Sequence, residues 1–139
     1  MTAVVKSNAA YIVIGGNMYE IKTDLKKNRL YLIFGEMDRA EIQQAVKEIE
    51  EACKTLIHGF TCMTVLHKEQ GVKQQDDDLI YEAQEIVTRY GVSKVVRVLR
   101  NENAFVQRQL DVLIVKPEYH VEYKNSIEEA EKILDGDIS

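Results

Sequence analysis

The chain has 139 residues, of which 45% are hydrophobic and 29% charged, and these values are typical of one folded domain. They exclude a disordered or low-complexity chain. The net charge of −5 argues against a nucleic-acid or anionic-membrane partner. Two cysteines are too few for a disulfide framework, and no apolar run reaches the roughly 18 residues that span a bilayer. We therefore expect a single domain over residues 1–139, with no transmembrane segment.

The N-terminal third indicates antiparallel strands. An apolar run over residues 9–14 precedes a glycine-rich turn. A secretory leader needs a longer run, so we expect a cytoplasmic protein. Polar and apolar residues alternate over 19–24, whereas 30–34 is almost continuously apolar. These segments predict an antiparallel meander whose last strand lies inside the sheet, after a frayed end at residues 1–8.

Helix and strand patterns alternate over the rest of the chain. The clearest helix pattern covers residues 42–56, with Asp38 and Glu41 in a capping-box arrangement before it and Gly59 as its expected stop. The later expected elements are a strand over 60–66, a helix that starts near 76–78 and runs to 90, a strand over 95–99, a third helix over 105–115, an edge strand over 121–123 and a final helix over 127–134. Because parallel strands need helical crossovers, this order predicts an α/β domain. Its mixed sheet would combine antiparallel N-terminal strands with βαβ units and about four helices, and residues 136–139 would be frayed.

Four short strings carry a family resemblance: residues 28–38 (NRLYLIFGEMD), 59–61 (GFT), 91–98 (GVSKVVRV) and 126–131 (SIEEAE). They resemble the STAS superfamily of anti-sigma-factor-antagonist-like domains, in a divergent, stand-alone bacterial form. The resemblance runs from about Tyr19 to Leu134, and it implies a STAS-like fold and a non-enzymatic regulatory or interaction module. Signalling members of that family are phosphorylated on a serine or threonine after the third family strand. The corresponding residues 65–76 contain neither, so the phosphorylation switch does not transfer.

The expected strand over 95–99 carries the most informative charged residue. Arg97 alternates with valines and shares a face with Val95 and Leu99. A guanidinium among apolar side chains needs a carboxylate on a neighbouring element or a route to water. Ligands of open α/β sheets collect outside the carboxyl ends of the strands, so the loops after the strands ending near Leu66 and Leu99 are a candidate site for an anion or an acidic partner. The candidate binding residues are His67, Lys68, Arg97, Arg100, Asn101, Asn103 and Arg108.

Other functions remain as alternatives. The apolar segment 105–115 exceeds what one helix face buries, so it belongs to the core, to a homodimer contact or to a pocket beneath the third helix. Such a pocket would make the chain a small-molecule or lipid carrier, and the resemblance leaves this open because some divergent relatives are similar to lipid- or nucleotide-binding domains. An enzyme would use His67 or His120 with nearby acids.

The remaining polar groups favour structural roles, and we expect no metal or cofactor. Cys53 lies on a helix stripe and Cys62 in a strand, which is not the spacing of a zinc site. The three adjacent acids at 76–78 lack the alternation of a calcium loop and suit a charged helix start. The basic residues Lys26, Lys27 and Arg29 form a small corner, which we interpret as a solvated hairpin tip.

Overall fold

A computed structural model of the chain describes residues 2–7, 10–15, 19–35, 37–66, 76–99 and 120–136. They form a single α/β domain. Within these residues, no helix is both long and apolar enough to cross a membrane.

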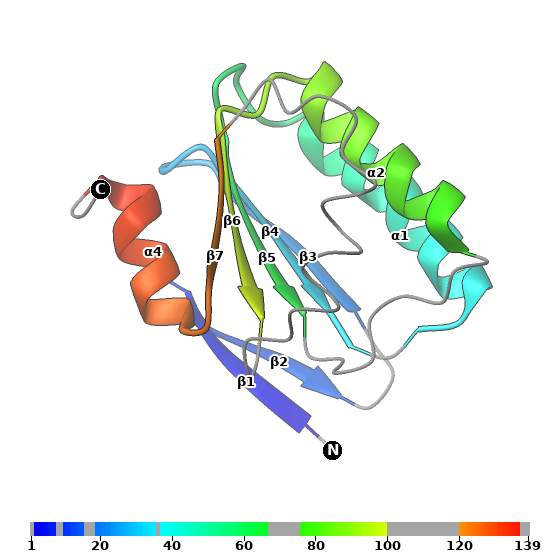
Figure 1. The fold of residues 1–139 in the computed structure, drawn as a ribbon, viewed down its shortest axis with the longest axis horizontal. Coiled ribbons are helices and arrows are strands. Elements are labelled where there is room, and N and C mark those ends of the chain that lie inside the picture. The colour runs from blue at the N-terminus through cyan, green and yellow to red at the C-terminus, as the bar shows by residue number, and fades with distance from the viewer. Residues whose placement is uncertain are drawn as a thin grey trace.

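The centre of the fold is a five-stranded mixed sheet with strand order β3-β4-β5-β6-β7 (Figure 1). Its strands are β3 (Tyr19–Asp24), β4 (Arg29–Phe34), β5 (Thr61–Leu66), β6 (Lys94–Leu99) and β7 (His120–Lys124). β3 and β4 are antiparallel, and the remaining neighbours are parallel. The predicted mixed sheet and the edge position of its last strand are thus confirmed. β4 is buried along most of its length, as its continuous apolar sequence predicted.

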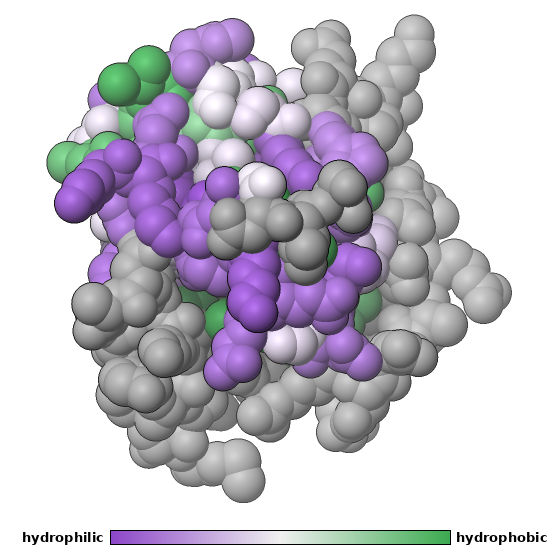
Figure 2. Space-filling view, turned by 90° about the vertical axis from the view of Figure 1, so that its left-hand side faces the viewer, coloured by the Kyte–Doolittle hydropathy of each residue, from purple (hydrophilic) through white to green (hydrophobic). Residues whose placement is uncertain are grey.

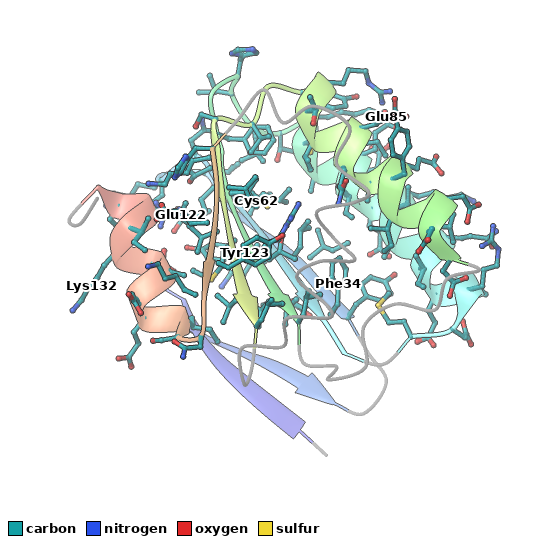
Figure 3. All side chains as sticks on the ribbon, viewed as in Figure 1. Phe34, Cys62, Glu85, Glu122, Tyr123 and Lys132 are labelled. Carbon is teal, nitrogen blue, oxygen red and sulfur yellow. The ribbon has the colours of Figure 1, made fainter. Side chains whose placement is uncertain are left out.

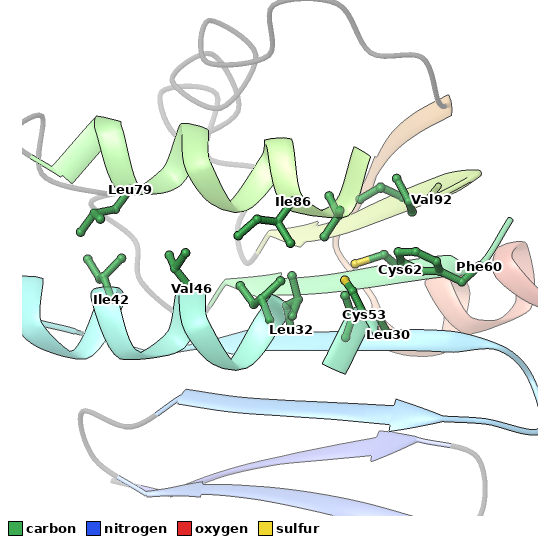
Figure 4. Packing of buried hydrophobic residues seen from close by; sticks show 13 residues of the cluster. Leu30, Leu32, Ile42, Val46, Cys53, Phe60, Cys62, Leu79, Ile86 and Val92 are labelled. Carbon is green, nitrogen blue, oxygen red and sulfur yellow. The ribbon is translucent and has the colours of Figure 1, made fainter. Parts of the chain in front are cut away.

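Helices cover both faces of this sheet. α1 (Arg39–Cys53) and α2 (Asp77–Arg89) lie on one face, and α4 (Ile127–Asp135) lies on the other (Figure 1). The apolar stripes of α1 and α2 face each other and the sheet, as Ile42 and Leu79 illustrate (Figure 4). A second apolar cluster joins α4 to the opposite face of the sheet. The alternation of strand residues between two faces explains this three-layer arrangement. The expected third helix over 105–115 lies outside the described residues.

The helix boundaries follow their capping residues. At the start of α1, the Asp38 carboxylate accepts from the Glu41 amide at 2.8 Å and the Glu41 side chain accepts from the Asp38 amide at 3.1 Å, which confirms the capping box. The C-terminal boundary of the sequence prediction is wrong, because α1 ends at Cys53. Residues 54–59 form turns instead, and Gly59, with φ +95°, belongs to this connection rather than to the helix.

The N-terminal strands differ from the prediction. β1 (Thr2–Ser7) and β2 (Ala10–Gly15) form a separate two-stranded antiparallel sheet, so β2 is not the first strand of a meander with β3 (Figure 1). β1 also lies in the segment for which we expected a frayed end. Its register sets Val4 opposite Val13. Thr2–Ser7 is therefore a paired strand, and the expectation of a frayed end at residues 1–8 is wrong for this segment.

Candidate functional site

Arg97 is the candidate site residue that the structure describes. It lies in β6, two residues before the carboxyl end of that strand, and only 4% of its surface is exposed. The other candidates, His67, Lys68, Arg100, Asn101, Asn103 and Arg108, lie outside the described residues. The described part of the candidate site therefore consists of Arg97 and the carboxyl ends of β5 and β6, which the candidate loops follow.

The strand register places Arg97 between Thr64 of β5 and Tyr123 of β7. Its Nη1 donates to the Tyr123 hydroxyl at 2.5 Å, and its Cζ lies 5.4 Å from the centre of the Tyr123 ring. We expected a carboxylate partner on a neighbouring element, and the described hydrogen bond goes to a phenol. A neutral acceptor and an aromatic ring together offset part of the cost of burying the charge.

Apolar side chains cluster at the carboxyl ends of β5 and β6. Leu66, Ile80, Leu99 and Tyr123 form one contact cluster there, and Leu99 is 4% exposed. Phe34 and Tyr123 both project into the space between the sheet and the two helices (Figure 3). The described residues between Arg97 and these strand ends are therefore mainly apolar, and an apolar environment strengthens an electrostatic contact.

An ion-pair cluster joins the N-termini of α1 and α2 at the same edge. Arg39 contacts the Asp76 carboxylate at 3.2 Å and the Asp78 carboxylate at 2.7 Å. Hydrogen bonding from Arg39 lowers the pKa of Asp78. The side chain of Asp76 is 3% exposed and makes no capping hydrogen bond to α2, so its described contact is the ion pair with Arg39. Asp77 and Asp78 lie in the first turn of α2, as the predicted charged helix start requires.

Groups of metal-ligand type are not assembled in the described part of the chain. No group of three or more histidine, cysteine or acidic residues there is arranged to hold a metal ion. His120, one of the two histidines considered as catalytic residues of an enzyme, is exposed, and its Nε2 lies 3.3 Å from the Glu122 Oε2. Both cysteines are buried, and desolvation raises the pKa of each thiol to about 12.

The basic corner at the β3–β4 turn is only partly the solvated tip that we predicted, because Lys26 and Lys27 are exposed but Arg29 is buried. Arg29 is 2% exposed; its Nε donates to Thr61 at 2.9 Å and its Nη1 to Asp135 at 2.9 Å. Glu131 accepts from both Arg29 and the Tyr31 hydroxyl. Sequence reasoning missed this network because Arg29 follows two lysines in a turn. Its position at the start of a buried strand was the available signal.

The network of Arg29 anchors α4 rather than forming a site. The Lys27 ammonium group lies 2.9 Å from Asp135, so two cations meet two carboxylates at the C-terminal half of α4. Burial disfavours the charge on Asp135, but hydrogen bonds from Lys27 and Arg29 prevail and lower its pKa. Seen from the side of α4, the described surface is mainly hydrophilic (Figure 2), as expected for a helix that buries its apolar stripe against the sheet.

Comparison of the chain with family models, with curated proteins and with solved structures found no match.

Proposed function

We propose that the chain is a non-enzymatic regulatory or protein-interaction module of the STAS-like type, acting in the cytoplasm. Recognition would involve the loops that follow β5 and β6. The observation that carries this proposal is the register of these strands, in which Leu66 is paired with Leu99. Because β5 and β6 are parallel, the segments that follow them leave the same edge of the sheet from adjacent positions.

The chemistry of these segments fits recognition of an acidic surface. His67 and Lys68 follow Leu66 directly, and Arg100 and Asn101 follow Leu99. Neighbouring strands lie about 4.8 Å apart, so both sets of donors begin within one side-chain length of each other. Concentrating cationic and amide donors on one edge of a chain with net charge −5 favours an acidic partner, which such a patch attracts and orients.

The proposal is tested by crosslinking from defined positions. A photoreactive residue replaces Lys68 or Arg100, and a control variant carries it at Lys54, which follows α1 and therefore lies near the amino end of β5. We expect one protein to be captured from positions 68 and 100 and not from position 54. With that protein purified, Arg100→Glu should weaken binding by about tenfold or more, whereas Lys54→Glu should leave it unchanged. Capture from position 54 alone, or unchanged binding by Arg100→Glu, would contradict the proposal.

The buried position of Arg97 favours a second candidate, a carrier of a small ligand with an anionic group and an apolar body. Arg97 contacts Tyr123, which belongs to the apolar cluster with Leu66, Ile80 and Leu99, so one end of such a ligand would meet a cation and the other end hydrocarbon. Native mass spectrometry of the freshly purified chain tests this candidate. A retained small molecule that is lost in Arg97→Met but kept in Arg89→Met, a change on the exposed side of α2, would support it. A ligand-free mass for the wild-type chain would count against it.

A further inference from the structure

The two cysteines form a pair inside the core. Cys53 is the last residue of α1 and Cys62 is the second residue of β5, and their exposed fractions are 1% and 0%. Both are free thiols within the same apolar cluster. Their sulfur atoms point toward each other (Figure 4), and Cys53 is close enough to act electrostatically on the thiol of Cys62.

We propose that Cys53 and Cys62 are an oxidation site at which a peroxide converts the two thiols into an intrachain disulfide. In the first step Cys53 loses its proton and the thiolate attacks hydrogen peroxide. The S–O bond forms, the O–O bond breaks, Cys53 becomes a sulfenic acid, and the leaving hydroxide takes up a proton to become water. In the second step the thiol of Cys62 attacks the sulfenic sulfur, the S–S bond forms, the S–O bond breaks and a second water leaves. The two sulfur atoms together lose two electrons, which reduce one peroxide to two molecules of water.

The position of Cys53 makes it the first sulfur to react. It has no helical residue after it, and the turns over 54–59 begin directly beyond it. Only a local opening of these turns is needed to bring peroxide to its sulfur, whereas Cys62 lies within a strand that is paired on both sides. The same freedom allows the end of α1 to shift toward β5 to reach the geometry that a disulfide requires.

Burial sets the rate of this reaction. Desolvation raises the pKa of both thiols to about 12, so the thiolate is scarce in the closed structure at neutral pH. Oxidation therefore proceeds through the opened form. The side chain of Asn28 holds the turn closed, because it is hydrogen-bonded to both the N–H and the C=O of Ile57. Removing that side chain should raise the population of the opened form and speed the oxidation.

The disulfide would connect the end of α1 to β5 and close the connection between them into a ring. Ile57, at the tip of this connection, is 72% exposed. Oxidation would therefore restrict the motion of an exposed apolar residue whose backbone is hydrogen-bonded to the Asn28 side chain in the reduced protein.

Tryptic mapping after treatment with hydrogen peroxide tests the proposal. Lys54 separates the two cysteines, so trypsin places Cys53 in the peptide 48–54 and Cys62 in the peptide 55–68. We expect these peptides to be linked after peroxide treatment, to resist alkylation in denaturant, and to separate on reduction. Neither Cys53→Ala nor Cys62→Ala should give a linked product, and the wild-type result does not depend on how well these variants fold.

A rate comparison tests the opening step. The linked product should form several-fold faster in Asn28→Ala than in the wild type, and Gln43→Ala, a change on the exposed side of α1, should not alter the rate. The proposal would be overturned if both cysteines stayed alkylatable at every peroxide concentration. It would also be overturned by separate sulfinic acids, by links between two chains, or by equal rates in Asn28→Ala and the wild type.

Discussion

The Asn28 side chain and the Ile57 backbone are joined by a pair of hydrogen bonds across two turns. The Asn28 Nδ2 donates to the Ile57 carbonyl at 3.0 Å, and the Ile57 amide donates to the Asn28 Oδ1 at 2.8 Å. Asn28 has a φ of +54°, in the left-handed region that asparagine tolerates better than most residues. Asn28 therefore joins the β3–β4 turn to the α1–β5 connection. Its backbone adopts the left-handed conformation of the turn, and its side chain makes both hydrogen bonds to Ile57.

Substitution of Asn28 should separate these two contributions. Asn28→Ala loses both hydrogen bonds, each worth about 1 kcal/mol, and alanine tolerates the positive φ less well than asparagine, which costs up to about 1 kcal/mol more. Asn28→Gly loses the same hydrogen bonds, but glycine adopts the positive φ without steric cost. We expect both variants to be destabilised in urea unfolding, Asn28→Ala more than Asn28→Gly. Equal stability of Asn28→Gly and the wild type would contradict this expectation, because the loss of both hydrogen bonds would then have no net cost.

Replacement of Arg29 by methionine should be strongly destabilising. The change removes the cation and leaves the half-buried carboxylate of Glu131 with the Tyr31 hydroxyl and Lys27. Breaking a buried ion pair from one side costs about 3–5 kcal/mol, whereas replacing both partners with apolar residues costs less. In urea unfolding, Arg29→Met should therefore be less stable than the double variant Arg29→Met/Glu131→Leu. The reverse order would mean that the pair is a minor contact.

Acid should weaken the contact between α4 and the β3–β4 turn. Although burial opposes the charge of Asp135, its hydrogen bonds from Lys27 and Arg29 lower its folded-state pKa below the ordinary 3.8. A lowered carboxyl pKa stabilises the fold above the unfolded-state pKa, and this contribution is lost as the pH falls from about 4 through the folded-state pKa. The free energy of unfolding, measured by urea titration from pH 6 to pH 3, should fall less steeply in Asp135→Asn than in the wild type. Identical slopes would contradict this assignment.

The parts of the fold that could be predicted from the sequence depend on local patterns. The spacing of apolar residues in α1, the Asp38–Glu41 capping box and the apolar run of β4 are each visible within one short segment of the sequence. Such patterns are fixed by the geometry of a single element. The parallel pairing of β5 with β6 followed from the alternation of strand and helix patterns, because parallel strands need a helical crossover.

The parts that could not be predicted depend on contacts between distant segments. Arg29 is hydrogen-bonded to Glu131, 102 residues away. Its place at the start of a buried strand indicates burial, but no local pattern indicates that its partners lie on α4. The sequence pattern around Arg97 correctly indicated a buried guanidinium that needs a hydrogen-bond partner. The described answer is Tyr123, a ring on an edge strand whose register only the assembled sheet defines.

Gly91 should be among the positions least tolerant of a side chain. It has a φ of +93°, and a Cβ added there would lie 2.2 Å from Cδ2 of His58. Gly136 has a similar φ of +86° but no atom within 4 Å of such a Cβ, so Gly136→Ala measures the backbone cost alone, about 1 kcal/mol.

Gly91→Ala should lower the free energy of unfolding by clearly more than Gly136→Ala, because His58 must also move away from a site where Gly59 donates to the Gly91 carbonyl at 2.7 Å. His58 is exposed, so truncating it removes the clash without opening the core. The double variant Gly91→Ala/His58→Ala should therefore recover stability to the level of Gly136→Ala in urea unfolding. If it were no more stable than Gly91→Ala, the steric contact with His58 would not be the cause.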